Sequence, residues 1–354
     1  MNLFNSRAPG VEWNPQDEPE DTLRIANEPT LDPYPTACLA CQGEIGFDGY
    51  CLQCGEKAKN LRERYDLSPT DWVSGVCDIG QVHIRNEDAL ACLGDACRAV
   101  LVVCDGVTTS EDSDVASMAA ARTACEQLWT NNPQGVGTQS SRTAAVYGTL
   151  TKAVLAANQA VIDKTDPHSL NSAASTIAIA IIDSNAVYCA NLGDSRVYWL
   201  PDSGEPALLT KDHSLAQVDI EAGTKRAEAE SSPFAHTITR WLGLDAVELD
   251  PFLASQELEQ PGWILVCSDG LWNYASEAKA LAAIVGSIED PSPEQLATRL
   301  VAWANEQGGH DNITVAVARF SERISEAEDQ GVALSSTDNF LDQDSIPTQP
   351  VSAD

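Results

Sequence analysis

Four aspartates, spread over more than two hundred residues, each stand at one end of a short apolar run. Asp105 and Asp269 follow such a run and precede glycine, whereas Asp88 and Asp311 come just before one. A buried strand that ends in Asp-Gly places a carboxylate at a sheet edge and lets the backbone approach a ligand closely. Carboxylates that gather at one place repel one another unless cations lie between them, and hard divalent metals prefer oxygen ligands. The pattern therefore predicts a metal centre bridged by carboxylates.

Two Cys-x-x-Cys pairs near the N-terminus, Cys38/Cys41 and Cys51/Cys54, are separated by nine residues. Each pair suits a tight turn that points two thiolates at one tetrahedral ion. We expect a small zinc ribbon with one structural Zn ion, because so short a segment buries little core and needs the metal for stability. Ordinary thiols or a redox pair are the alternatives.

Composition excludes several classes of protein. The 354 residues include 21 lysines and arginines against 53 aspartates and glutamates, a net charge of −32, which argues against nucleic acid as a partner. The longest apolar runs are six to seven residues, too short to span a membrane. No basic and apolar leader opens the chain, so we expect a cytoplasmic location. Eleven cysteines in that setting indicate thiols and metal ligands, not a disulfide framework.

The organisation of the chain follows from where apolar periodicity begins and ends. Residues 1–36 are acidic and rich in Pro and Asn, and residues 322–354 form an equally acidic tail, so we expect both to be disordered. The zinc ribbon should occupy residues 37–56, followed by a linker over 57–70. Residues 71–321 carry the strand-like and helix-like patterns of the main domain.

Strands and helices are expected in clusters within the main domain. The strand-like segments are 72–79, 89–93, 99–104, 176–183, 186–192, 196–200, 263–267 and 313–320. The helix-like segments are 114–129, 144–162, 275–285 and 293–305. Two helices fall between the third and fourth strands and two between the last two, which favours mixed sheets covered by helices over a parallel βαβ wind.

The order of short motifs resembles that of the metal-dependent serine/threonine protein phosphatases of type 2C, over roughly residues 72–320. Any one motif is weak evidence, but eight in family order are highly specific. They are Asn-Glu-Asp-Ala at 86–89, Val-Cys-Asp-Gly at 103–106, Ser-Thr at 175–176, Asn-Leu-Gly-Asp-Ser-Arg-Val-Tyr at 191–198, Leu-Thr-Lys-Asp-His-Ser at 209–214, Ile-Thr-Arg-Trp-Leu-Gly at 238–243, Cys-Ser-Asp-Gly-Leu-Trp at 267–272 and Gly-His-Asp-Asn-Ile-Thr at 309–314.

The resemblance implies an α+β fold, a four-layer αββα sandwich of two antiparallel sheets flanked by helices, preceded here by the zinc ribbon. It also implies two Mn or Mg ions in a cleft at one sheet edge. A water or hydroxide that bridges the ions would attack phosphoserine or phosphothreonine directly, without a covalent phosphoenzyme. By the same resemblance Asp105 bridges the ions, Asp88 and the carbonyl of Gly106 face the second ion, and Asp269 and Asp311 hold the first.

Residues around these ligands have expected roles of their own. By resemblance, Asp194 matches a ligand of a weaker third ion seen in bacterial members, shared there with the Asp269 position; a turn that caps its strand is the alternative. Asn312 should fix the loop that carries Asp311. Cys104 and Cys267 lie inside apolar runs and are read as packed core residues.

The chain departs from the family pattern five residues before the aspartate of Asn-Glu-Asp. Most members carry there an arginine that binds substrate phosphate, whereas this chain has His83, with Arg85 two residues later. Histidine cannot supply a bidentate fork and is largely neutral at pH 7. Alternation along a strand would put residues 83 and 85 on one side, so Arg85 is a candidate phosphate contact and His83 a candidate proton donor. A solvent-facing Arg85 is the alternative.

A second departure follows the Asp-Gly at residues 105–106. Members usually continue with a glycine-rich run that carries histidine, whereas Val107–Asp112 has neither glycine nor histidine. The acidic side chains in this loop could recruit metal or reject acidic substrates. Because the metal ligands are complete, we expect activity with altered efficiency. His213 and His236 are further candidate proton donors, although His213 is expected mainly to brace its turn.

Two functions remain open at this stage. The first is a phosphatase whose partners are phosphorylated proteins, namely bacterial-type serine/threonine kinases and their substrates. The second is a catalytically weakened phosphoprotein-binding scaffold that docks through its zinc ribbon. A zinc-ribbon regulator of nucleic acid is disfavoured by charge. The segment 216–237, with its Lys225-Arg226 pair, is expected to be a flap beside the cleft that reads the substrate chain.

Overall fold

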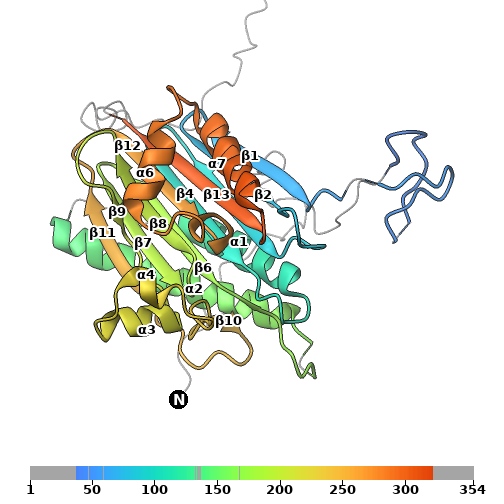
Figure 1. Cartoon of the computed structure of the whole chain (residues 1–354), viewed down its shortest axis with the longest axis horizontal. Coiled ribbons are helices and arrows are strands. Elements are labelled where there is room, and N and C mark those ends of the chain that lie inside the picture. The colour runs from blue at the N-terminus through green and yellow to red at the C-terminus, as the bar shows by residue number, and fades with distance from the viewer. Residues whose placement is uncertain are drawn as a thin grey trace, which may run out of the picture.

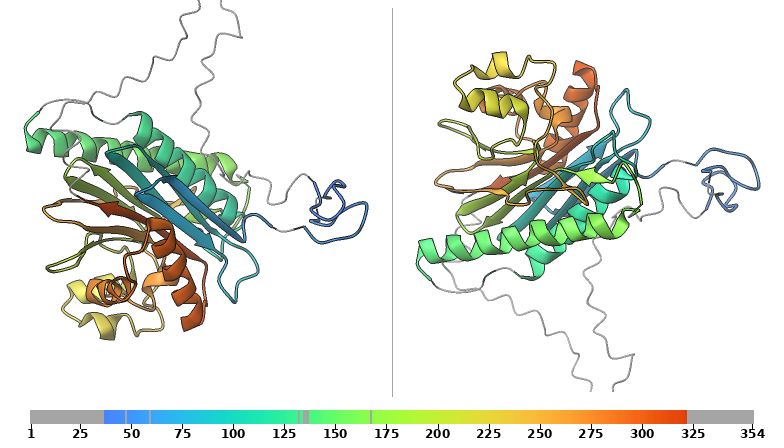
Figure 2. Two further views of the ribbon diagram at one scale, coloured as in Figure 1. Left: turned by 90° about the horizontal axis from the view of Figure 1, so that it is seen from above. Right: turned by 90° about the horizontal axis from the view of Figure 1, so that it is seen from below.

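The computed structural model describes residues 37–321, except residues 47, 59, 132, 134–136 and 167. The acidic segments 1–36 and 322–354, for which disorder is expected, lie outside the described residues. From Arg64 to Phe320 the chain forms two antiparallel sheets packed face to face, with helices on both outer faces (Figures 1 and 2). The expected four-layer α+β sandwich is confirmed.

The first sheet has six strands in the order β1-β2-β13-β12-β8-β9, all neighbours antiparallel. Its strands are β1 (Arg64–Thr70), β2 (Val73–Asp78), β13 (Ile313–Phe320), β12 (Gly262–Cys267), β8 (Arg196–Pro201) and β9 (Ala207–Leu208). Helices α6 (Ala278–Gly286) and α7 (Pro293–Gln307) cover its outer face.

The second sheet has five strands in the order β11-β7-β6-β4-β3. Its strands are β11 (Phe252–Glu257), β7 (Ala186–Leu192), β6 (Ile177–Asp183), β4 (Arg98–Asp105) and β3 (Asp88–Gly94). The long helices α1 (Ser113–Thr130) and α2 (Gln139–Lys164) form the fourth layer, as Figure 2 shows. The short strands β5 (Ala174–Ser175) and β10 (Leu242–Gly243) pair with each other beside α2.

The two sides of each inner strand pack into different cores. In β12, Ile264 and Val266 join the core that lies between the sheets and reaches α1 and α2. Leu265 and Cys267 join the second core, under α6 and α7. Since successive strand side chains point to opposite faces, a strand covered on both sides must be apolar throughout. This is why the runs that flank the four aspartates are continuous instead of alternating.

Residues 64–70, expected to belong to a linker, form β1 at one edge of the six-stranded sheet. The linker expectation is wrong for this stretch. Tyr65 and Leu67 are buried while the residues between them are exposed, so only alternate side chains are apolar. The strand also contains Pro69, which an edge strand tolerates because its N–H need not pair. Arg62, just before β1, is 5% exposed, so the packed part of the main domain begins before residue 71.

Helix boundaries differ from expectation at two places. α2 begins at Gln139 instead of near residue 144, because the Thr138 hydroxyl caps it by accepting the N–H of Ser141. The helix expected over 275–285 begins at Ala278 and is preceded by a single turn, α5 (Asp269–Trp272). The expected flap contains two short helices, α3 (Leu215–Glu221) and α4 (Arg226–Ala229). None of the helices in the described part of the chain combines the length and hydropathy needed to span a membrane.

Candidate metal centre

Asp88 and Asp105 are direct cross-strand partners at one end of the five-stranded sheet. β3 begins at Asp88 and β4 ends at Asp105, so the antiparallel register places the two residues opposite each other. The backbone of Asp105 is fixed from β5 and β6: its N–H donates to Thr176 Oγ1 at 3.1 Å and its carbonyl accepts from the Ser175 hydroxyl at 3.0 Å. Two carboxylates that come from separate strands are therefore held side by side.

Asp269 and Asp311 lie at the same end of the six-stranded sheet. β12 ends two residues before Asp269, β13 begins two residues after Asp311, and the two strands pair antiparallel. The sheets are joined here by Ser268, whose hydroxyl donates to Asp88 Oδ2 at 2.7 Å and accepts the N–H of Thr314 at 3.0 Å. The four aspartates on which the metal prediction rests thus converge from four strand ends.

The loop that leads into Asp88 is tied to Asp311 by one amide side chain. Asn312 Oδ1 accepts the N–H of Glu87 at 2.7 Å, and its Nδ2 donates to the carbonyls of Ile79 and Arg85. Gly106 passes so close to this loop that a Cβ there would lie 2.6 Å from the carbonyl oxygen of Glu87. Only glycine therefore fits immediately after Asp105. Asn312 and Gly106 fix the distance between the two sides of the centre.

Burial raises the pKa values of Asp88, Asp105 and Asp269, and repulsion from neighbouring carboxylates adds to the effect. Burial and the charges of Asp311 and Asp269 raise the pKa of Asp88 to about 8. Burial and the charge of Asp311 raise the pKa of Asp269 to about 7. Burial and the charge of Asp88 raise the pKa of Asp105 well above its usual range. Among the described residues, no lysine or arginine forms an ion pair with these three side chains. A set of buried, unneutralised carboxylates suits hard divalent cations, which favour the charged form.

The structure places His83 and Arg85 apart, and the reasoning from strand alternation is wrong because residues 79–87 form an irregular loop. His83 Nε2 lies 3.4 Å from Asp311 Oδ1, beside the centre. Arg85 instead pairs with Glu87 at 2.5 Å and lies 3.6 Å from Asp114. Its side chain is 46% exposed. The phosphate contact assigned to Arg85 therefore stays a prediction.

A third group of ligand atoms adjoins Asp269. Side-chain atoms of Asp194, Asp269 and His236 all lie within 4.8 Å of one another. Asp194 is in the turn between β7 and β8, and His236 is in the flap after α4. Burial raises the pKa of Asp194 and lowers that of His236, so the imidazole is neutral at pH 7. From the sequence His236 is only a candidate proton donor, because nothing near a lone histidine marks it as a neighbour of two distant aspartates.

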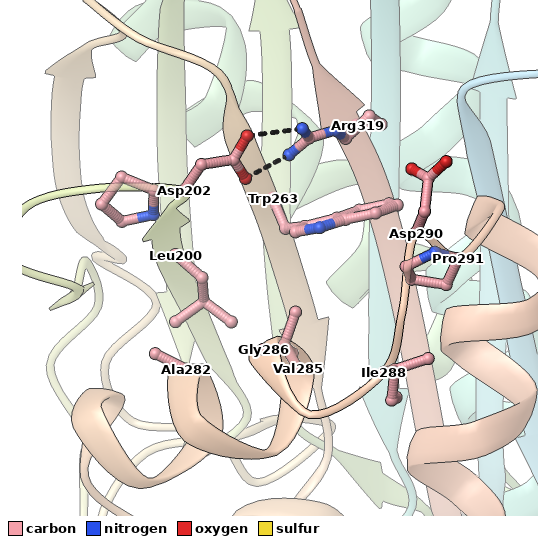
Figure 3. A pocket seen from close by; sticks show the side chains of 11 residues that line it. Leu200, Asp202, Trp263, Ala282, Val285, Gly286, Ile288, Asp290, Pro291 and Arg319 are labelled. Carbon is pink, nitrogen blue, oxygen red and sulfur yellow. Dashed lines mark hydrogen bonds and ion pairs between the residues drawn. The ribbon is translucent and has the colours of Figure 1, made fainter.

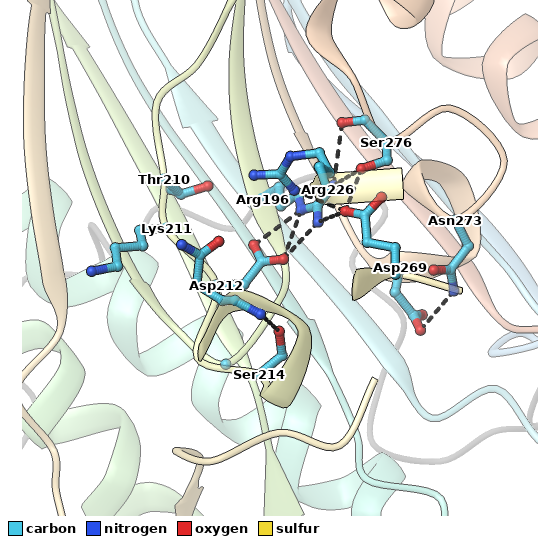
Figure 4. A network of polar contacts seen from close by, with 12 residues as sticks. Arg196, Thr210, Lys211, Asp212, Ser214, Arg226, Asp269, Asn273 and Ser276 are labelled. Carbon is cyan, nitrogen blue, oxygen red and sulfur yellow. Dashed lines mark hydrogen bonds and ion pairs between the residues drawn. The ribbon is translucent and has the colours of Figure 1, made fainter. Parts of the chain in front are cut away.

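The flap is anchored beside this group by Arg196, which is 1% exposed (Figure 4). Arg196 binds Asp212 through Nε and Nη2, at 3.0 and 2.6 Å, and reaches Glu230 of the flap at 3.1 Å. Its guanidinium lies 3.5 Å from the ring centroid of Trp272. Arg196 therefore connects β8, the flap and the turn α5.

The four N-terminal cysteines form a separate cluster. Their sulfur atoms all lie within 4.8 Å of one another, with Cys38 to Cys54 at 3.6 Å and Cys41 to Cys51 at 3.4 Å. Four thiolates around one zinc would be about 3.8 Å apart, given Zn–S bonds of about 2.3 Å. Hydrogen bonding from the backbone of Cys54 lowers the pKa of Cys51 to about 6, whereas the neighbouring thiols raise the pKa of Cys54 to about 12. The cluster suggests the expected zinc site.

A cavity of about 270 Å³ lies at the opposite ends of the strands that carry Asp269 and Asp311 (Figure 3). Its walls include Trp263, Val285 and Ile288. Arg319 lines it as well, but both of its terminal nitrogens are bound to Asp202 at 2.6 Å. The cavity is therefore separate from the carboxylates and adds nothing to their chemistry.

The chain is similar to known proteins in both sequence and structure. The chain matches the family described as "Protein phosphatase 2C" over residues 80–305, well over half its length. It is 30% identical over 257 residues to the protein phosphatase PhpP of Streptococcus pneumoniae, covering 72% of this chain and 99% of the relative. A crystal structure of the Mycobacterium tuberculosis serine/threonine phosphatase PstP/Ppp matches with a TM-score of 0.57 and 28% identity, over 70% of this chain and 98% of that one. The PstP catalytic domain in complex with two manganese ions matches with a TM-score of 0.54 and 25% identity, over 70% and 98%.

Proposed function

This chain belongs to the protein phosphatase 2C family, and from that premise we propose that it hydrolyses phosphoserine and phosphothreonine esters in proteins. One observation carries the proposal: Asp88, Asp105, Asp269 and Asp311 converge from four strand ends, and their mutual repulsion calls for cations. The names of the relatives, which are serine/threonine phosphatases, and the manganese bound to PstP support the same reading.

The carboxylates would hold two Mn or Mg ions, and Asp105 would be shared by both. Asp88 and the carbonyl of Gly106 would serve one ion, and Asp269 and Asp311 would serve the other. When bound, the two ions would supply an activated water and neutralise charge on the phosphoryl oxygens. Ser268 orients Asp88 through its hydroxyl, and the backbone N–H of Asn312 orients Asp311 by donating to its Oδ1 at 2.8 Å.

His83 and Arg85 are assigned to the substrate. His83 Nε2, held beside Asp311, would deliver a proton to the seryl or threonyl oxygen as it leaves. Arg85 would contact the phosphate with the part of its guanidinium that Glu87 and Asp114 leave exposed. The exposed acidic residues Glu111 and Asp112 lie in the loop that follows Asp105 and Gly106, and they would disfavour acidic substrates.

The zinc ribbon and the partners complete the proposal. One structural Zn ion would bind Cys38, Cys41, Cys51 and Cys54, and the ribbon would dock a partner, because four thiolates leave zinc no open position. The substrates would be phosphorylated serine/threonine kinases and their target proteins in the cytoplasm.

The test is hydrolysis of a phosphothreonine peptide by the intact protein, with and without Mn, beside Asp269→Asn. Asp269 would hold an ion that stabilises the transition state by several kcal/mol. Loss of this ligand should therefore lower turnover at least about 100-fold. Asp66→Asn, on the exposed side of edge strand β1, is the matched control and should retain full turnover. Turnover that is independent of Mn, or that survives Asp269→Asn, would contradict the proposal.

The pairing of Arg85 with Glu87 and Asp114 favours a second candidate, the catalytically weakened phosphoprotein-binding scaffold. Two nearby carboxylates partly neutralise the positive charge of the Arg85 guanidinium, so the guanidinium attracts a phosphate less strongly. In the same assay, Mn-dependent binding of the phosphopeptide without hydrolysis would select the scaffold.

A further inference from the structure

Arg85, the residue proposed to contact the substrate phosphate, shares one carboxylate with a second arginine. Arg85 Nη1 lies 3.6 Å from Oδ1 of Asp114, the second residue of α1. The other oxygen of this carboxylate, Asp114 Oδ2, accepts a hydrogen bond from Arg62 Nη1 at 3.2 Å. Asp114 therefore contacts a different guanidinium group with each of its two oxygens.

The side chain of Arg62 is held by Asp114 alone. Its Nη2 donates to the Asp114 carbonyl at 2.7 Å, and its Nε is a buried atom without a hydrogen-bond partner in the described part of the chain. A guanidinium buried to this extent has lost most of its hydration, so its charge needs a carboxylate partner. Arg62 and Asp114 thus neutralise each other, and Arg85 contacts a carboxylate that is already paired.

The backbone of Arg62 is fixed to the loop that carries Arg85. The Arg62 carbonyl accepts Nδ2 of Asn86, the residue that directly follows Arg85, at 2.9 Å. The Arg62 N–H donates to Asn60 Oδ1 at 2.9 Å. Arg62 precedes residues 80–305, the part of the chain that matches the family, so the resemblance gives it no role.

The charges nearest to Arg85 are acidic. Glu87, Asp114 and Asp112 all place negative charge near its guanidinium, and Glu87 Oε1 lies 2.5 Å from Arg85 Nη2. Without the positive charge of Arg62, the carboxylate of Asp114 would attract Arg85 more strongly, because no second cation would compete for it. A guanidinium held closely by two carboxylates has fewer donors and less net charge to offer a phosphate.

We infer that Arg62 is a positioning residue for substrate binding: by pairing with Asp114, it keeps the Arg85 guanidinium available to the substrate phosphate. The inference deepens the proposed function and rests on it for the contact between Arg85 and phosphate. Arg62 does not touch the substrate and acts only through Asp114 and Arg85. Its loss should therefore weaken substrate binding without slowing the chemical step.

The experiment measures KM and kcat of the full-length, Mn-loaded protein for a phosphothreonine peptide. Arg62→Met should raise KM on the order of 10-fold and leave kcat within about twofold, because the lost interaction is the same in ground state and transition state. Adding Asp114→Asn to this variant should return KM to within about twofold of the parent value, since the competing carboxylate is then absent. Arg64→Met, which breaks an ion pair with Asp78, is the matched control and should keep the parent KM.

A second pair of variants shows whether the effect passes through Arg85. In the Arg85→Met background, Arg62→Met should change KM no further. If Arg62→Met does not fold, Arg62→Gln replaces it, because glutamine keeps a hydrogen-bond donor and removes the charge. An unchanged KM in the Arg62 variant, a rise in KM that Asp114→Asn does not reverse, a further rise in the Arg85→Met background, or a loss confined to kcat would overturn the inference.

Failure of the proposed function would give a different result. In that case the parent protein itself does not hydrolyse the peptide. The dissociation constant of the Mn-loaded protein for a fluorescent phosphothreonine peptide, measured by anisotropy, then replaces KM in the same set of variants. The inference expects the same order of affinities, and equal affinities of the parent and the Arg62 variant would overturn it.

Discussion

Ser268 donates its hydroxyl hydrogen to Asp88 Oδ2 across the two sheets, at 2.7 Å. The hydroxyl oxygen of Ser268 also accepts the N–H of Thr314. One hydroxyl therefore fixes the position of a ligand from β3 relative to the strand ends that carry Asp269 and Asp311. The geometry of the centre depends on a residue that is not itself a ligand.

Ser268→Ala should weaken Mn²⁺ binding and fold stability together. The change leaves the buried N–H of Thr314 without its partner, which costs about 1–3 kcal/mol of unfolding free energy. Loss of the orienting bond to Asp88 should lower Mn²⁺ affinity on the order of 10-fold. Urea unfolding and calorimetric titration measure the two effects. Ser203→Ala, whose hydroxyl meets Gln260 at the surface, is the control, and equal behaviour of the two variants would contradict the assignment.

The metal-free protein should lose stability as the pH rises from about 4 to about 8. The pKa values of Asp88 and Asp269, about 8 and about 7, are higher in the folded chain than the usual value near 4. Raised carboxyl pKa values give stability that is full below the unfolded pKa and is lost as pH rises through the folded pKa. We expect a fall on the order of 2 kcal/mol in unfolding free energy, measured by urea unfolding in chelator.

Asp88→Asn is the companion to that measurement, because the amide has no charge to lose or gain. The metal-free variant should show a smaller fall between about pH 4 and about 8. Saturating Mn²⁺ should reverse the slope in the parent protein, since proton release then accompanies metal binding. A stability curve that is the same with and without Mn²⁺ would mean that these carboxylates do not share a cation.

His83→Arg should improve substrate binding more than it changes turnover. The variant restores the residue type that most of the resembled family carries at this position, and a guanidinium can bind phosphate through two parallel hydrogen bonds. We expect KM for a phosphothreonine peptide to fall roughly 10-fold. Because the proposed proton donor is lost, kcat should fall as well, and less so for an aryl phosphate whose leaving group needs no proton. Unchanged KM would place residue 83 away from the phosphate.

Removal of zinc should unfold the ribbon without stopping the hydrolysis of a small aryl phosphate. Cys51→Ser should reduce bound zinc from one ion per chain to near zero, measured by atomic absorption, because a structural site needs all four ligands. Cys97→Ser, which alters a cysteine of the main domain, should keep the zinc. Equal zinc content in the two variants would assign the cysteine cluster another role.

The sequence predicts the parts of this structure that local pattern determines. The strands that carry the aspartates are apolar on both faces. Asp-Gly ends two of them, Asn-Glu-Asp precedes β3 and Asp-Asn precedes β13, so both the elements and the meeting of their carboxylates could be anticipated. The direction of the Arg85 side chain could not, because it depends on Glu87 and Asp114 in an irregular loop. His236 was equally hidden, since its neighbours Asp194 and Asp269 are distant in sequence. The sequence does not predict β1 as a strand, because Pro69 lies within its alternating pattern.

Arg62 anchors the chain that connects the cysteine cluster to the main domain. Its guanidinium binds the carboxylate and the carbonyl of Asp114 at the start of α1, and its own carbonyl accepts Asn86 Nδ2 at 2.9 Å. The eight residues from Cys54 to this anchored arginine can extend at most about 28 Å. If the cysteine module docks a partner, as proposed above, that partner would therefore be tethered close to the loop that leads into Asp88. Such a tether raises the effective concentration of a captured phosphoprotein to the order of millimolar, so even a weak substrate sequence would be processed once its carrier has docked.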